Sequence, residues 1–114
     1  MKNGNVNSNK RNKVRIPLNK TGCLDFRNFN ENCVVIDISS NGIGLAVRSY
    51  FQEADEFRIS FPLEDGVEIR GSVFVVFANG SRVGGRLKFF NTMEQQKVEN
   101  FINKNTCRLA KEIK

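Results

Sequence analysis

Apolar and polar residues alternate along most of this chain, which predicts β-strands. The clearest segment is 56–61, where Phe57, Ile59 and Phe61 alternate with three polar residues. Residues 33–38 (CVVIDI) are instead rich in β-branched side chains, which favour strands. The other segments that predict strands are 18–26, 43–48, 67–77 and 82–90. The pattern therefore predicts six strands.

Short turn signals separate these strands. Residues 39–42 (SSNG) and 62–66 (PLEDG) contain the residue types that tight turns favour. Asn79 and Gly80 form a hairpin signal between the last two strands. Such short connections favour antiparallel neighbours in an all-β domain.

Alternation along residues 33–38 and into the following turn predicts which side chains face the core and which face outward. Side chains two residues apart share a face of a strand. We therefore expect Ile36 and Ile38 to point into the core. Val35, Asp37 and Ser39 are expected on the opposite face.

The end of the chain predicts a helix. A capping box begins at Thr92, and Val98, Phe101 and Ile102 follow at helical spacing. Residues 103–106 weaken the pattern before it resumes. The predicted fold is mainly β: a six-stranded antiparallel β-barrel with a C-terminal α-helix over it. Residues 1–12 are expected to be a flexible basic arm, and residues 13–114 the folded domain.

Charge is concentrated at the N-terminus. Of the 18 basic residues six lie in the first twenty positions, which contain no acidic residue. The remaining twelve basic residues equal the twelve acidic ones, so the net charge of +6 belongs to this segment. A basic arm indicates either an anionic partner or a solubilising tail.

The composition excludes several kinds of site. The chain has no histidine, so a Ser–His or Cys–His nucleophile cannot be built. Cys23, Cys33 and Cys107 lack metal-ligand spacing and are expected to be free thiols, with Cys33 in the core. We predict no catalytic residues, metal or cofactor. Without a signal-like or membrane-spanning apolar run, the expected location is the cytoplasm.

Two short motifs offer chemistry for a guanine nucleotide. Arg11 and Arg15 form an RxxxR pattern, and Asp37, Ser39 and Gly42 form a DxSxxG pattern. An arginine fork meets guanine O6 and N7 together, and it also binds phosphate. A carboxylate accepts from the guanine N1–H and N2–H₂ groups, while a glycine lets the backbone approach a flat ring.

With these two motifs in this order, the chain resembles the PilZ family of bacterial cyclic di-GMP receptors. The resemblance runs from about residue 10 to residue 102. It implies a barrel that binds cyclic di-GMP on its outer surface. The implied ligand-binding residues are Lys10, Arg11, Arg15, Asp37, Ser39, Ser40, Asn41, Gly42 and Phe77.

Two of these positions, and Arg86 outside them, carry further expectations. In the family, the position of Lys10 is associated with whether one ligand or a stacked pair binds. Phe77 lies where the family often has an aromatic ring near guanine, although burial statistics favour a core role for it. Arg86, in a segment resembling the family's late strand, is interpreted as an exposed strand residue.

The resemblance implies a stand-alone signalling effector that changes conformation on binding and engages a protein partner. Motility, secretion or exopolysaccharide machinery is the class of partner that the family suggests. Three alternatives stand beside it: a PilZ-like interaction module that binds no nucleotide, a barrel that binds RNA or single-stranded DNA, and an enzyme. Charge confined to the arm disfavours nucleic acid, and the missing histidine disfavours an enzyme.

Overall fold

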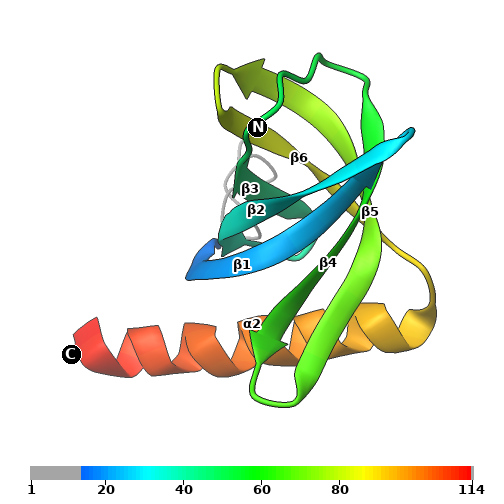
Figure 1. The fold of residues 1–114 in the computed structure, drawn as a ribbon. Coiled ribbons are helices and arrows are strands. Elements are labelled where there is room, and N and C mark those ends of the chain that lie inside the picture. The colour runs from blue at the N-terminus through cyan, green and yellow to red at the C-terminus, as the bar shows by residue number, and fades with distance from the viewer. Residues whose placement is uncertain (1–13, 114) are drawn as a thin grey trace, which may run out of the picture.

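Six strands and one helix form residues 14–113 of the protein (Figure 1). The computed structural model describes residues 14–113, with side chains described as far as residue 106. The elements are β1 (Ile16–Phe26), β2 (Phe29–Ile38), β3 (Gly42–Ala46), β4 (Glu56–Glu64), β5 (Val67–Asn79), β6 (Arg82–Phe89) and α2 (Thr92–Ile113).

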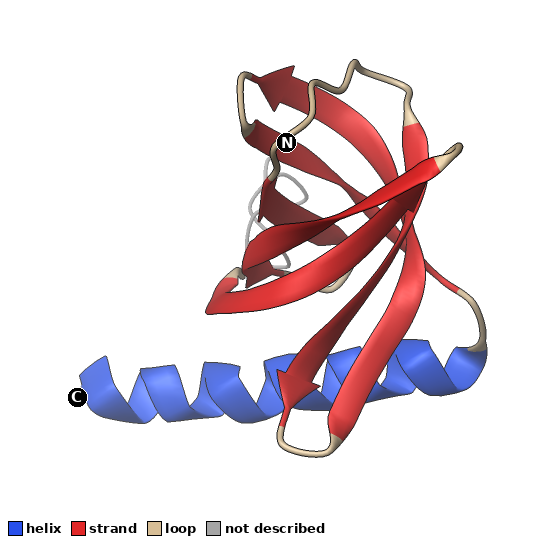
Figure 2. Cartoon of the chain, viewed as in Figure 1, coloured by secondary structure: helices blue, strands red, loops and turns tan. Residues whose placement is uncertain are grey.

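The strands close into a barrel in the order β1-β2-β3-β6-β5-β4, and every neighbouring pair is antiparallel. Closure occurs where Cys23–Asp25 of β1 pair with Arg58–Ser60 of β4. Figure 2 shows this all-strand layer with the single helix across one end. The predicted fold class is therefore confirmed.

The largest differences from the predicted strand boundaries are at the start of β2 and the end of β4. Strand β2 begins at Phe29, four residues before the predicted start, because residues 29–32 pair with the end of β1 across a two-residue turn. Strand β4 continues through Pro62 to Glu64. Beyond Ser60 it no longer pairs with β1, so the missing N–H of proline interrupts no hydrogen bond on that side.

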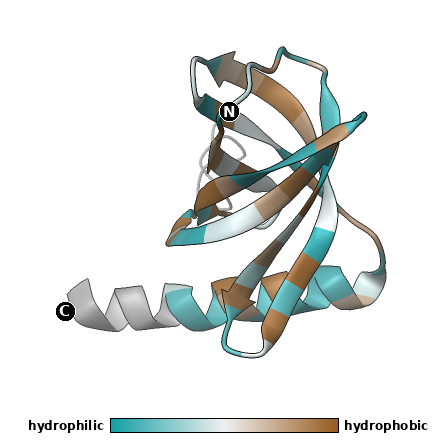
Figure 3. Cartoon of the chain, viewed as in Figure 1, coloured by the Kyte–Doolittle hydropathy of each residue, from teal (hydrophilic) through white to brown (hydrophobic). Residues whose placement is uncertain are grey.

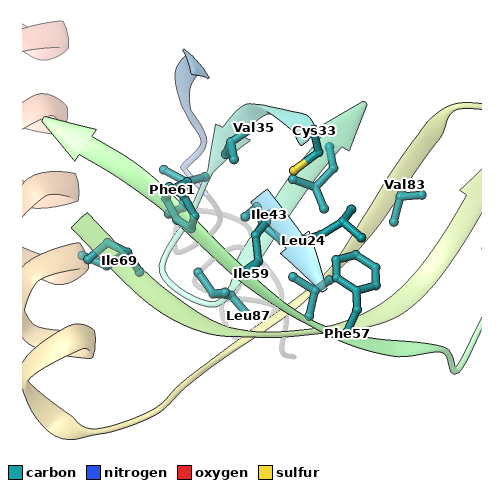
Figure 4. Close-up of a cluster of buried hydrophobic side chains, with 14 of the residues drawn as sticks. Leu24, Cys33, Val35, Ile43, Phe57, Ile59, Phe61, Ile69, Val83 and Leu87 are labelled. Carbon is teal, nitrogen blue, oxygen red and sulfur yellow. The ribbon is translucent and has the colours of Figure 1, made fainter. Parts of the chain in front are cut away.

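The barrel interior is filled by apolar side chains. Phe57, Ile59 and Phe61 are at most 3% exposed, as the alternation in β4 predicted. Figure 3 shows the resulting alternation of hydrophobic and hydrophilic bands along the strands. Figure 4 shows these side chains meeting Leu24 and Ile43 inside the barrel. Because side chains fill this interior, a ligand must bind elsewhere.

The face assignment in β2 is wrong at two residues. Val35 is fully buried, whereas Ile36 is only partly buried. The pairing of β2 with β3 shifts register between Val35 and Asp37, and this bulge changes which residues face inward. Ile38 is buried as expected, and Asp37 remains on the outside.

Helix α2 packs on one end of the barrel through Val98, Phe101 and Ile102, all of which are buried. Residues 103–106 do not interrupt it, and the Asn105 amide donates a hydrogen bond of 2.8 Å to the Phe101 carbonyl. No helix within residues 14–113 is both long enough and apolar enough to cross a membrane.

The helix cap is one residue earlier than the sequence predicted. The side-chain oxygen of Asn91 accepts from the Glu94 backbone N–H at 3.0 Å, so Asn91 is the N-cap residue. Glu94 is 5% exposed, and its carboxylate accepts from the Arg70 backbone N–H at 2.9 Å. Glu94 therefore anchors the first helical turn to β5.

We expect Asn91→Ala to lower the free energy of unfolding by about 1 kcal/mol, because it removes the cap acceptor. Thr92→Ala is the matched control, and it should change stability by only a few tenths of a kcal/mol. Urea denaturation followed by circular dichroism measures both. A larger loss for Thr92→Ala would contradict this assignment of the cap.

Cys33 is a core residue, 3% exposed, as predicted. Burial raises the pKa of its thiol to about 11, so the folded protein holds this proton more tightly than the unfolded chain does. The resulting stabilisation is present below about pH 9 and is lost as the pH rises toward 11.

A thiol-labelling experiment tests this burial. In a Cys107→Ser variant at pH 8, iodoacetamide should modify the exposed Cys23 quickly and Cys33 only after unfolding. Mass spectrometry counts the modified thiols. Rapid double labelling of the folded protein would contradict the burial of Cys33.

Candidate functional site

A groove of about 530 Å³ lies on the outer surface of the barrel. It follows β3 and β6, with the start of β1 and the end of β2 on one side and β5 on the other. Its lining includes Arg15, Asp37, Gly44, Phe77, Gly84 and Arg86. A groove of this size falls within the range of small-molecule sites.

An ion pair joins the two sequence motifs at this groove. Arg15 donates to Asp37 Oδ1 from Nη2 at 2.8 Å and from Nε at 3.2 Å. Val14 packs on the core and Ile16 is buried, so the residues flanking Arg15 anchor it to the barrel. Arg15 is therefore already fixed beside Asp37.

The turn between β2 and β3 is held by its own hydrogen bonds. The Ser39 backbone N–H donates to the Gly42 carbonyl at 2.9 Å, and the Gly42 N–H donates to Ser39 Oγ at 3.1 Å. The Leu87 N–H donates to the Asn41 carbonyl at 3.0 Å and ties the turn to β6. Ser39 lines the groove with Asp37, but it is 2% exposed and its hydroxyl shapes the turn.

Two glycines, Gly44 and Gly84, form the floor of the groove, and they lie opposite each other in the pairing of β3 with β6. A Cβ on Gly44 would come within 2.6 Å of Asp37 Oδ1, and one on Gly84 would overlap the Phe77 ring. Both positions therefore require glycine, because it lets the Asp37 carboxylate and the Phe77 ring pack directly on this glycine floor. Gly84 is buried as a result.

Phe77 lies on the outer surface. Its side chain is 52% exposed, so the core interpretation is wrong. The pairing of β5 with β6 shifts register between Val75 and Phe77, and this bulge turns the ring outward over Gly84. An exposed ring beside a glycine floor can stack on a planar ligand.

The structure brings most of the predicted site residues together. Arg15, Asp37, Ser39, Asn41, Gly42 and Phe77 all line the groove. Ser40 is half-buried in the turn and is outside the lining. Lys10 and Arg11 lie outside the described residues.

The predicted site residues did not include several residues of the groove, among them Gly84, and Arg86 was undervalued. Gly44 and Arg82 line the groove, and so does Arg86, which is exposed as predicted. The sequence shows which side chains alternate outward along β6. It does not show the register that places β6 beside β3. The lining contains three arginines and one aspartate, so the groove favours an anionic ligand.

The described residues offer no metal site. Within the described part of the chain, no three histidine, cysteine or acidic residues gather in a way that could hold a metal ion. The donor set of the groove is instead guanidinium groups, one carboxylate and backbone groups, which suits hydrogen-bonded recognition.

Comparisons with known proteins indicate which family and which folds this chain resembles. A family model described as the PilZ domain matches residues 9–104. No curated protein sequence matches the chain. One similar solved structure is the inhibitor of motility MotI of Bacillus subtilis, with a TM-score of 0.67 and 15% identity. The match covers 87% of this chain and 52% of that protein.

Two further structures contain cyclic di-GMP by their descriptions. MrkH of K. pneumonia with c-di-GMP has a TM-score of 0.69 and 17% identity, covering 90% of this chain and 53% of that one. The PilZ domain of Escherichia coli YcgR with c-di-GMP has a TM-score of 0.66 and 12% identity, covering 91% and 97%. The chain spans about half the length of MotI and MrkH.

Loss of the ion pair should leave the barrel folded. We expect Arg15→Ala to lower the free energy of unfolding by at most about 1 kcal/mol, because partly exposed pairs contribute little. Chemical denaturation of the variant and the wild-type protein measures this. A loss of more than about 3 kcal/mol would mean that Arg15 supports the fold itself.

Proposed function

The chain belongs to the PilZ domain family, and from this we propose that it binds cyclic di-GMP in the groove over β3 and β6. The family match extends over most of the chain, and the MrkH and YcgR structures of similar fold hold this ligand. Cyclic di-GMP is a bacterial second messenger, so the proposal also places the protein in the bacterial cytoplasm.

One observation carries the proposal: the Arg15–Asp37 pair and the exposed Phe77 ring line the same groove. Both hydrogen bonds from Arg15 use Oδ1, so Asp37 Oδ2 can accept from guanine N1–H and N2–H₂. The remaining N–H groups of Arg15 can meet guanine O6 and N7, or a phosphate oxygen. A guanine at this position satisfies both side chains.

Phe77, supported by Gly84, provides a surface for the face of the base. The ring of Phe77 packs over Gly84, and because Phe77 is 52% exposed it can stack on a base in the groove. Stacking of a base on an aromatic ring contributes about 1–3 kcal/mol. In the proposal, Ser39 and Gly42 fix the turn, while Ser40 and Asn41 shape its edge.

The N-terminal basic residues complete the proposed site. We assign Lys10 and Arg11 to the second guanine edge of the ligand, because charge-assisted hydrogen bonds suit guanine O6 and N7. The two phosphates carry about two negative charges, which the basic segment attracts. Ordering of this segment on the ligand would create a new surface for a protein partner. Motility, secretion or exopolysaccharide machinery is the proposed class of partner.

We expect Arg15→Ala to weaken cyclic di-GMP binding about a hundredfold or more, because it removes charge-assisted hydrogen bonds to the ligand. Isothermal titration calorimetry with cyclic di-GMP measures the affinity and the number of ligands bound.

Arg70→Ala is the matched control, since Arg70 is exposed on β5 and lies outside the groove. Its affinity should stay within about twofold of the wild type, because screening weakens distant charges. Unchanged affinity in a folded Arg15→Ala protein would refute the proposed site.

A further inference from the structure

Arg82 and Arg86 stand on either side of Gly84 along the outer face of β6. Both are exposed, and both line the groove although neither belongs to the RxxxR or DxSxxG motif. Arg86 is opposite Gly42 of β3, and Arg82 is opposite Ala46. The four-residue separation places their Cα atoms about 13 Å apart along the strand.

The charges of these two arginines are not neutralised locally. Among the side chains described, as far as residue 106, no carboxylate lies within ion-pair distance of Arg82 or Arg86. The one carboxylate in the groove, Asp37, is paired with Arg15. The groove therefore carries two positive charges in excess, both on β6.

The order of strands decides which part of a nucleotide these arginines can reach. Across the groove, Asp37 packs on Gly44 on one side and the Phe77 ring covers Gly84 on the other. A base held between Asp37 and Phe77 uses the width of the groove. The rest of the nucleotide must then extend along the strands, toward Arg82 in one direction and Arg86 in the other.

Resting on the proposed function, we infer that Arg82 and Arg86 bind the phosphates of the cyclic dinucleotide. The two phosphates carry the charge that the groove lacks, and guanidinium–phosphate hydrogen bonds are charge-assisted and often bidentate. Asp37 and Arg15 then bind the guanine edge, while Arg82 and Arg86 of β6 bind the phosphates. The site therefore includes two cationic residues on β6 that belong to neither motif.

Calorimetry with cyclic di-GMP tests this with Arg82→Gln, Arg86→Gln and the double variant. Each single variant should bind about tenfold more weakly, because it loses a charge-assisted contact. The double variant should bind more weakly than either. Arg70→Gln has the same change of charge outside the groove, and it should stay within about twofold of the wild type.

Two further readouts separate phosphate binding from base recognition. Arg82→Lys and Arg86→Lys should keep most of the affinity, because lysine binds phosphate as a point charge but cannot form the guanine fork. The defect of the Gln variants should also shrink at high salt, because ions screen the lost attraction. A lysine variant as weak as its Gln counterpart would overturn the phosphate assignment.

The outcomes distinguish this inference from the proposed function. A wild-type protein that binds no cyclic di-GMP would overturn both. Wild-type binding with Gln variants no weaker than Arg70→Gln would overturn the role of β6 and leave the proposed function standing. Urea denaturation of each variant verifies that weak binding does not come from unfolding.

Discussion

Closure of the sheet, where β1 pairs with both β2 and β4, constrains everything else in this molecule. A six-stranded barrel leaves an interior that apolar side chains fill, and Phe61, Leu24 and Ile43 do so here without measurable exposure. Ligand recognition must therefore use the outer surface. Closure also brings β3 beside β6, strands that are far apart in sequence, and so creates the glycine floor.

In the proposed outer site, the barrel positions the polar groups before any ligand arrives. Arg15 precedes β1 and Asp37 lies near the end of β2, where the pairing of these strands holds the two together. The turn at Ser39 and Gly42 satisfies its own hydrogen bonds. A ligand that pairs with these groups does not have to order them, which lowers the entropic cost of binding.

The sequence predicted the barrel and its helix because alternation in the strands is strong, as in residues 56–61. It missed the start of β2 because residues 29–32 are mostly polar and exposed. The bulges beside Val35 and Phe77 reverse which side chains face outward, and no local pattern encodes them. Motif spacing found Arg15 and Asp37, but Arg82 and Gly44 join the groove only through the β3–β6 register.

Backbone amide shifts of the glycines, followed by NMR during a titration with cyclic di-GMP, test the account most directly. Gly42, Gly44 and Gly84 line the groove, whereas Gly66 and Gly71 lie outside it. The account predicts that the first three amides shift with saturation and that the last two stay in place. Binding that moves Gly66 and Gly71 while the groove glycines stay unchanged would contradict it, as would the absence of any shift.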